Sequence, residues 1–265
     1  MNPVKKKLND GGVCLGQMVL ELFTPGIGPM LAAAGAEFVI FDMEHGRCDL
    51  SLAAEMIASC RGSSIVPMVR VPDSRDAPLS RVLDLGARGV MIPRVGTRAE
   101  VEDCIEQLKY PPRGRRGVAL GVAHDLYQPG PPSFFEQANE DTLTIGILET
   151  VEALENLESI VSTPDLDIAW MGHYDLTTSM GIPGQFDHPR FLEAMDTLVS
   201  ACNRHGVAPG FLPATPRDAI HWIGKGFRAI SLASDIGMFI TATRDFRAAV
   251  VDATANKHTK GTAQA

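Results

Sequence analysis

The stretch FVIFDMEHG, residues 38–46, holds the pattern that decides the fold. A short apolar run from Phe38 to Phe41 ends directly on Asp42, and Glu44 and His45 follow it closely. A run of this length and composition is typical of a strand that is buried on both faces. The ionisable residues after it form either a polar turn or a group of side chains that the strand delivers to a cleft.

Similar apolar runs recur along the chain, and each is followed by a longer segment that suits a helix. Together with FVIFDM (38–43), the predicted strands are VCLGQMVLEL (13–22), SIVPMVRV (64–71), GVMIPRV (89–95), LTIGILE (143–149), DIAWMG (167–172), VAPGFL (207–212) and FRAISLA (227–233). The first four begin about 25 residues apart, a period that suits strand–helix units with a parallel sheet.

The segments between the runs carry helix signals. Thr97 to Glu100 reads as a capping box, and Thr215 stands as a cap residue before Pro216. An apolar stripe also follows the fifth run, at Val151, Leu154, Leu157 and Ile160. Eight strands alternating with helices predict an α/β fold, a (β/α)8 TIM barrel, as a single domain over residues 1–252. The alternative is an open doubly wound sheet, which the absence of a G-x-G-x-x-G motif after the first strand disfavours.

The remaining segments fall into three groups. Two insertions, from Tyr110 to Asp141 and from Tyr174 to His188, are long enough to be functional or interfacial loops. Residues 253–265 are polar and unpatterned, and we expect a disordered tail. The basic loop Arg113-Gly114-Arg115-Arg116-Gly117 is either an anion cradle or a solvated surface.

Composition narrows the class of partner. The 265-residue chain has a formal net charge of -8, which disfavours a nucleic-acid partner because phosphates attract basic surfaces. No run of 18 apolar residues occurs, and the five cysteines show no C-x-x-C spacing. We expect reduced, buried thiols in a cytoplasmic protein that has no membrane partner.

Charged residues gather where the predicted strands end. Asp42, Glu44 and His45 follow the second strand, Arg70 the third and Glu149 the fifth, and the sixth runs into Gly172-His173-Tyr174-Asp175. In a barrel of this kind the catalytic groups come from these carboxyl ends. Taken singly, Glu149 could favour the start of a helix, and Asp175 could favour a turn. Together, the two carboxylates suit an oxygen-ligand site for Mg²⁺ or Mn²⁺.

Arg70 and His45 have two interpretations each. Arg70 could form an interface salt bridge, or it could hold a carbonyl or carboxylate oxygen of a substrate. His45 could be an ordinary surface group, or it could transfer protons when a carboxylate orients it. Asp42, Glu44 and Asp84 are the candidate orienting acids.

These motifs resemble those of the class II, pyruvate-dependent aldolases of the HpcH/HpaI type, typified by 4-hydroxy-2-oxoheptanedioate aldolase. The similarity runs from about Gly16 to Ser234 and is carried by FDMEHG, PMVRV, VLDLGARGVMIPRV, YPPRGRRGV, the segment after ILET and MGHYDLTTSMGIPG.

The resemblance implies a divalent metal held by Glu149 and Asp175, either Mg²⁺ or Mn²⁺ with Co²⁺ as a further candidate, and no organic cofactor. It implies that Arg70 holds the keto oxygen of a 2-oxo acid and that His45 transfers a proton with help from Asp84. Backbone amides from Gly172 to Asp175 would grip the substrate carboxylate, and His173, Tyr174 and Leu212 would line the pocket. Asp42 and Glu44 would not contact the substrate but would orient the catalytic side chains that do. It also implies a homo-hexamer, a trimer of dimers that swap their last helix.

The predicted reaction is therefore cleavage or formation of 4-hydroxy-2-oxo acids from a 2-oxo acid and an aldehyde, by an aldehyde-lyase. Three alternatives stay open: a lyase for acyl-CoA hydroxy acids, a decarboxylase of oxaloacetate-type acids, and a barrel that only binds a metabolite. Ile147 and the pair His173-Tyr174 depart from the family pattern, so the donor and acceptor stay open too.

Overall fold

The chain folds as a closed barrel of parallel strands in the order β1-β2-β3-β4-β5-β6-β7-β8. The computed structural model describes residues 1–73 and 79–261, with side chains as far as Thr254. The strands are β1 Cys14–Val19, β2 Phe38–Asp42, β3 Val66–Arg70, β4 Gly89–Ile92, β5 Leu143–Leu148, β6 Ile168–Met171, β7 Ala208–Phe211 and β8 Ala229–Ser234. The predicted (β/α)8 barrel is confirmed, and each observed strand overlaps one of the predicted runs.

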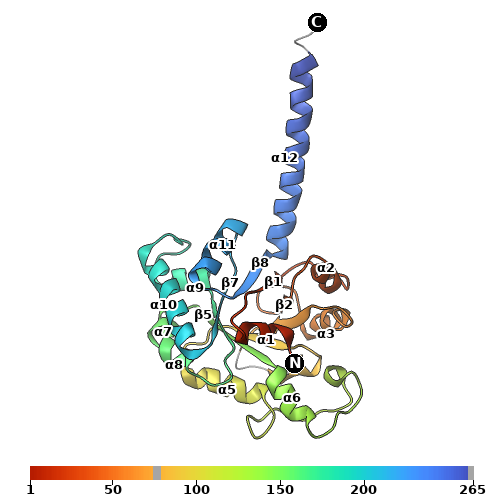
Figure 1. Ribbon diagram of the computed structural model, residues 1–265, viewed down its shortest axis with the longest axis vertical. Helices are drawn as coiled ribbons and strands as arrows, with labels where there is room; N and C mark the ends of the chain where they lie inside the picture. Colours follow the sequence, from red (N-terminus) through yellow and green to blue (C-terminus); the bar gives the residue numbers. More distant parts are fainter. Residues whose placement is uncertain (74–78, 262–265) are drawn as a thin grey trace.

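Helices alternate with the strands and surround the barrel (Figure 1). They are α1 Pro3–Asn9, α2 Ile27–Ala33, α3 Leu50–Ser59, α4 Ser80–Asp84, α5 Arg98–Leu108, α6 Phe134–Asp141, α7 Val151–Glu155, α8 Leu157–Val161, α9 His173–Ser179, α10 Pro189–His205, α11 Pro216–Lys225 and α12 Asp235–Gly261, with a 3₁₀ turn η1 at Ala123–Asp125. The capping box at Thr97 and the cap at Thr215 both form as predicted.

Two apolar clusters hold the barrel together. Side chains such as Phe38, Met68 and Trp170 fill its interior, and a larger cluster lies between the strands and the outer helices. Burial on both faces explains why the strands read as continuous apolar runs rather than as alternating ones. Val4 and Leu8 of α1 pack into the interior cluster, so α1 closes the amino end of the barrel and leaves the carboxyl end for chemistry.

Three segments differ from the expectations. The stripe after β5 is divided into α7 and α8 at Asn156, whose side-chain amide donates to the Gly96 carbonyl at 2.9 Å. The first insertion contains η1 and α6, and the second begins with α9. Helix α12 continues through residue 252 to Gly261, so residues 253–261 are helical here, while 262–265 lie outside the described residues. The domain boundary itself stays a prediction.

The last helix also has an unusual position. Figure 1 shows α12 projecting away from the barrel as one long helix, with its far end distant from the other helices. Its apolar side chains Phe239, Phe246 and Val250 are 63%, 76% and 49% exposed. Across residues 1–73 and 79–261, no helix is both long and apolar enough to cross a membrane.

Candidate active site

Side chains from the ends of several neighbouring strands meet at the carboxyl rim of the barrel. The register of β2 and β3 places Asp42 directly beside Arg70. Glu149 follows β5, and Gly172 connects β6 to α9, which carries Asp175 in its first turn. The rim therefore brings together most of the residues that the sequence singled out.

Arg70 is held in a fixed orientation by acids of the FDMEHG turn. Its Nε and Nη2 donate to the two carboxylate oxygens of Asp42 at 2.7 and 2.6 Å, and its Nη1 lies 3.2 Å from Glu44 Oε2. Burial opposes the charge on Arg70, but the hydrogen bonds and charge of Asp42, with Glu44, raise its pKa. Arg70 is thus a charged, pre-oriented donor at the rim.

Asp42 also shapes the turn after β2. Its side chain is fully buried, and its two oxygens accept from the backbone N–H groups of Glu44 and His45 at 2.9 and 3.3 Å. One carboxylate therefore fixes both the guanidinium of Arg70 and the path of the segment that presents His45. Asp42 thus positions both groups through its own hydrogen bonds.

Glu149 lies at the centre of a group of acids. Its side chain is buried, and its Oε1 accepts from the backbone N–H of Arg94 at 2.6 Å. Burial raises the pKa of Glu149 to about 7; the Arg94 N–H opposes this, while the charges of Asp175 and Glu44 add to it. Burial likewise raises the pKa of Glu44, and the positive charges of Arg70, His45 and Arg94 oppose this shift. Glu44 Oε2 is buried without a hydrogen bond, although it lies 3.2 Å from Arg70 Nη1.

These acids suit a divalent cation. Repulsion among Glu149, Asp175 and Glu44 is the situation that a bound cation relieves, and carboxylate oxygens are the ligands that Mg²⁺ and Mn²⁺ prefer. A Cβ on Gly172 would lie 2.6 Å from Glu149 Oε2, so only glycine leaves that oxygen free. Among the described residues, no cluster of three or more His, Cys, Asp or Glu is arranged as a metal site. Two protein ligands, with water or substrate completing the shell, fit this donor set.

His45 and Asp84 are not joined by any contact in the part of the chain described. The imidazole is 58% exposed, and its Nε2 lies 3.7 Å from Glu44 Oε2. Asp84, at the end of α4, instead accepts from Arg116 Nη2 at 2.6 Å. Of the three candidate orienting acids, Glu44 lies beside the imidazole, whereas Asp42 bonds to the backbone N–H of His45.

An aromatic group borders the rim beside α9. The His173 ring lies 5.1 Å from Phe186 and 5.0 Å from Phe211, and the Tyr174 ring lies 5.0 Å from Phe186. Burial lowers the pKa of His173 to about 4, although Asp175 opposes this, so the ring is neutral near pH 7. Leu212, directly after β7, packs against the interior cluster, and Tyr174 is exposed.

Arg94 is the rim residue that the sequence analysis missed. It follows β4 with φ of 55°, a left-handed conformation that aims its backbone N–H at Glu149. Its guanidinium Nη2 lies 3.1 Å from Glu44 Oε1. The available signal was the likeness of PMVRV and MIPRV, two neighbouring apolar runs that each carry an arginine as their second-last residue.

The basic loop after α5 does not form an open anion cradle. Arg113 pairs with Asp165 and Glu140, and Arg115 pairs with Asp103 and Glu106. The third arginine, Arg116, is buried. This removes the main candidate surface for the phosphates of an acyl-CoA.

Comparison with known proteins places the chain among carbon–carbon lyases. Residues 18–242 match the sequence profile of HpcH/HpaI aldolase/citrate lyase. A 5-keto-4-deoxy-D-glucarate aldolase of Shigella boydii is 30% identical over 215 residues, which cover 81% of this chain and 83% of that protein.

Solved structures give the same result. A HpcH/HpaI aldolase/citrate lyase family protein from Burkholderia cenocepacia superposes with a TM-score of 0.88 at 28% identity, covering 94% of this chain and 99% of the other. The citrate synthase SbnG superposes with a TM-score of 0.81 at 28% identity, covering 95% and 97%.

Proposed function

Because the chain belongs to the HpcH/HpaI aldolase/citrate lyase family, we propose that it is a metal-dependent aldolase for 4-hydroxy-2-oxo acids. It would join pyruvate or a related 2-oxo acid to an aldehyde, or cleave the product, as an aldehyde-lyase. The observation that carries this proposal is the acid group around Glu149 beside the pre-oriented Arg70. Binding of a metabolite alone would not require a charged donor and a proton-transfer group together.

Glu149 and Asp175 would hold the divalent cation, Mg²⁺ or Mn²⁺ or Co²⁺. When bound, such a cation polarises the 2-oxo acid and stabilises negative charge on its keto oxygen. Arg70, fixed by Asp42, donates to the same oxygen as it gains charge. Because Arg70 is already oriented, little reorganisation is needed when that charge develops.

His45 would transfer the proton of the hydroxyl group that lies beyond the new carbon–carbon bond. Its exposure places the imidazole at the mouth of the site, and Glu44 is the acid that orients it in this proposal. The backbone N–H groups between Gly172 and Asp175 would bind the substrate carboxylate at the start of α9. His173, Tyr174 and Leu212 would limit the size of the 2-oxo acid.

A second candidate is carbon–carbon chemistry on a citrate-like or oxaloacetate-type acid. The likeness to the citrate synthase SbnG over most of both chains favours it. Such a reaction passes through a similar enolate, so it needs the same rim groups. The two candidates differ in the substrate that reacts with that enolate.

A substrate panel tests the proposal. Purified protein is incubated with pyruvate or hydroxypyruvate and a set of aldehydes, with 5-keto-4-deoxy-D-glucarate, and separately with oxaloacetate, in Mg²⁺ or Mn²⁺. We expect carbon–carbon bond formation or cleavage that stops when a chelator is added. Glu149→Gln should be inactive, whereas Arg217→Gln, an exposed change on α11, should be unaffected. Turnover that persists in the chelator would exclude the metal-dependent mechanism.

The assembly and location belong to the same proposal. We propose a homo-hexamer, a trimer of dimers in which α12 of each subunit packs on a partner. The exposed apolar side chains of the projecting α12 support this, because such residues are normally covered. We propose a cytoplasmic protein, since its reactants would be small soluble acids and aldehydes.

A further inference from the structure

A cavity lies away from the catalytic rim, and the acids and arginines of the rim do not line it. It has a volume of about 420 Å³, opens to solvent, and is bordered by α3, α4, α6 and the segment around η1. Its lining includes Ile65, Arg88 and Thr142, which directly precede β3, β4 and β5 respectively. The cavity is therefore at the amino end of the same strands whose carboxyl ends lead to Arg70, Arg94 and Glu149.

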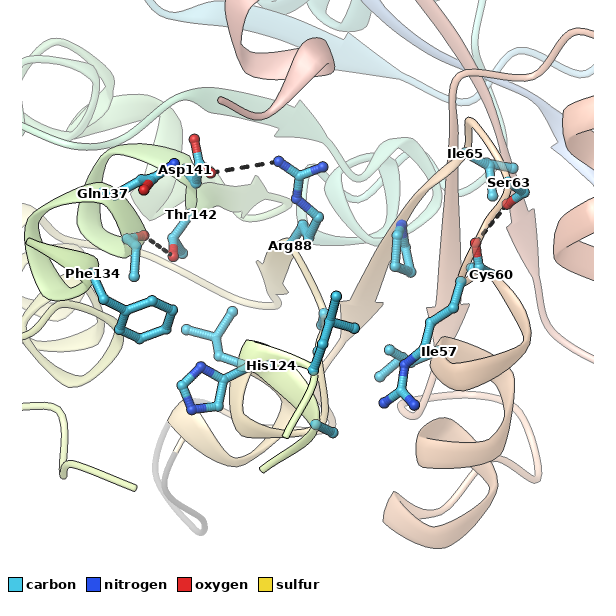
Figure 2. A pocket seen from close by; sticks show the side chains of 18 of the residues that line it. Ile57, Cys60, Ser63, Ile65, Arg88, His124, Phe134, Gln137, Asp141 and Thr142 are labelled. Atoms are coloured by element: carbon cyan, nitrogen blue, oxygen red, sulfur yellow. Dashed lines mark hydrogen bonds and ion pairs between the residues drawn. The ribbon is translucent and has the colours of Figure 1, made fainter. Parts of the chain in front are cut away.

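The lining of the cavity combines apolar side chains with a group of polar and charged side chains. Figure 2 shows Ile57 and Cys60 on one side of the cavity and Phe134 and His124 on the other, with Arg88 directed toward Asp141. The volume is large enough for a ring or a short hydrocarbon chain. A cavity of this kind, mostly apolar with a few polar groups, is the usual form of a small-molecule site.

The charges on the described lining leave a positive balance. Arg61, Arg88 and Arg116 face the cavity with Asp141 as the one described acid on its lining, and Arg116 is bonded to Asp84 outside it. The Met1 ammonium also lies 3.5 Å from Asp141 Oδ1, so four positive charges stand against these two carboxylates and leave a balance of two. This contrasts with the net charge of -8 on the whole chain.

The arginines are incompletely paired. Arg88 Nη2 lies 3.6 Å from Asp141 Oδ2, beyond hydrogen-bond distance, and Arg61 stacks over the exposed Tyr127 ring with its guanidinium carbon 5.5 Å from the ring centre. Arg116 is 5% exposed, and its buried Nε has no hydrogen-bond partner. Arg116 Nε thus lacks an acceptor, and the guanidinium groups of Arg61 and Arg88 are accessible to a ligand.

We propose that this cavity binds a monoanionic organic acid with an apolar body, such as an aromatic carboxylate. Its carboxylate pairs with Arg88, and its ring fills the space between Ile57 and Phe134. The positive balance of the lining suits a carboxylate, and the apolar walls suit the ring. This inference does not depend on the proposed aldolase reaction, because none of the rim groups takes part.

Isothermal titration calorimetry with 2-naphthoate tests the proposal, with the neutral 2-naphthalenemethanol as the matched ligand. We expect the acid to bind at least about tenfold more tightly than the alcohol, since a charge-assisted pair contributes at least about that factor. Arg88→Gln should weaken the acid about tenfold and leave the alcohol unchanged. Arg217→Gln, which removes an exposed arginine elsewhere, should change neither affinity.

Two more variants locate the binding. Ala138→Trp, on α6 in the cavity wall, should abolish binding of both ligands by filling the space. Glu149→Ala, at the rim, should leave both affinities unchanged. If Ala138→Trp does not fold, as judged by circular dichroism, Arg88→Gln still decides the outcome. Equal affinities for acid and alcohol, no binding of the acid, or loss of binding in Glu149→Ala would each overturn the proposal.

Discussion

Arg70 illustrates how one side chain can serve both stability and chemistry. Its guanidinium makes two parallel hydrogen bonds to the fully buried Asp42. Breaking such a buried pair costs about 3–5 kcal/mol, because the remaining charge is left without its partner. Position 70 therefore requires the planar fork of arginine, which the point charge of a lysine does not replace.

Arg70→Lys tests this requirement. We expect the free energy of unfolding to fall by about 2 kcal/mol, somewhat less than for full removal of the charge. In the proposed reaction, kcat should fall at least a hundredfold, since one preorganised donor to a developing oxyanion is worth about that much. Urea unfolding and steady-state kinetics measure the two effects. Arg217→Lys is the matched control, and a fully active Arg70→Lys would contradict the role assigned to the fork.

The raised pKa of Glu149 predicts that the affinity of the protein for metal depends on pH. This pKa is raised to about 7, and only the ionised carboxylate is a good ligand. Mn²⁺ affinity should therefore fall about tenfold for each pH unit below 7 and level off above it. Calorimetric titration between pH 6 and 8.5 measures this. Glu149→Gln should bind metal weakly at every pH, and an affinity that is flat across this range in the native protein would refute the assignment.

The same shift has a consequence for stability without metal. The ordinary pKa of a glutamate is 4.5, so between 4.5 and about 7 the folded state holds a proton that the unfolded state has lost. Stability falls with rising pH wherever the folded state binds more protons. The metal-free protein should thus lose stability as the pH rises from 4.5 to 7, and Glu149→Gln should lessen that loss. Urea midpoints across this range check the sign.

At the level of elements, the strand pattern could be predicted and the connections between strands could not. Eight apolar runs specify eight strands because both faces of each strand are buried. The approach of Arg94 to Glu149 depends on one left-handed residue after β4, which has no clear signature in a non-glycine. Likewise, the partner of Asp84 is Arg116, brought in by the long insertion, and sequence proximity did not reveal it.

The junction of β6 and α9 gives a prediction at this scale. Gly172 has φ of -87°, so alanine fits its backbone, but an added Cβ would meet Glu149 Cβ and Oε2 at 2.6 Å. Gly172→Ala should displace Glu149 and reduce metal affinity about tenfold or more, as loss of supporting contacts does in metal sites. Gly224→Ala in α11, where nothing lies near the added Cβ, is the control. Equal metal affinity in both variants would contradict the close packing at this junction.

At the scale of the whole molecule, α12 is the element that the isolated chain leaves without cover. This long helix exposes Phe239, Phe246 and Val250, and every side chain described from Thr241 to Thr254 is exposed rather than covered by the barrel. Helices of this kind are stabilised mainly by packing, and an isolated one is marginal in water. A partner subunit therefore offers the natural contact surface.

Phe246→Glu tests whether that surface is an interface. Sedimentation velocity should show an oligomer for the native chain and a smaller species for Phe246→Glu, because a charge in an apolar contact costs several kcal/mol. Arg247→Glu changes the adjacent exposed residue and should keep the assembly if only the apolar positions of α12 are buried. A native chain that sediments as a monomer at micromolar concentration would disprove the swapped arrangement, whatever the activity. If Phe246→Glu keeps the native size, the interface must lie elsewhere on the barrel.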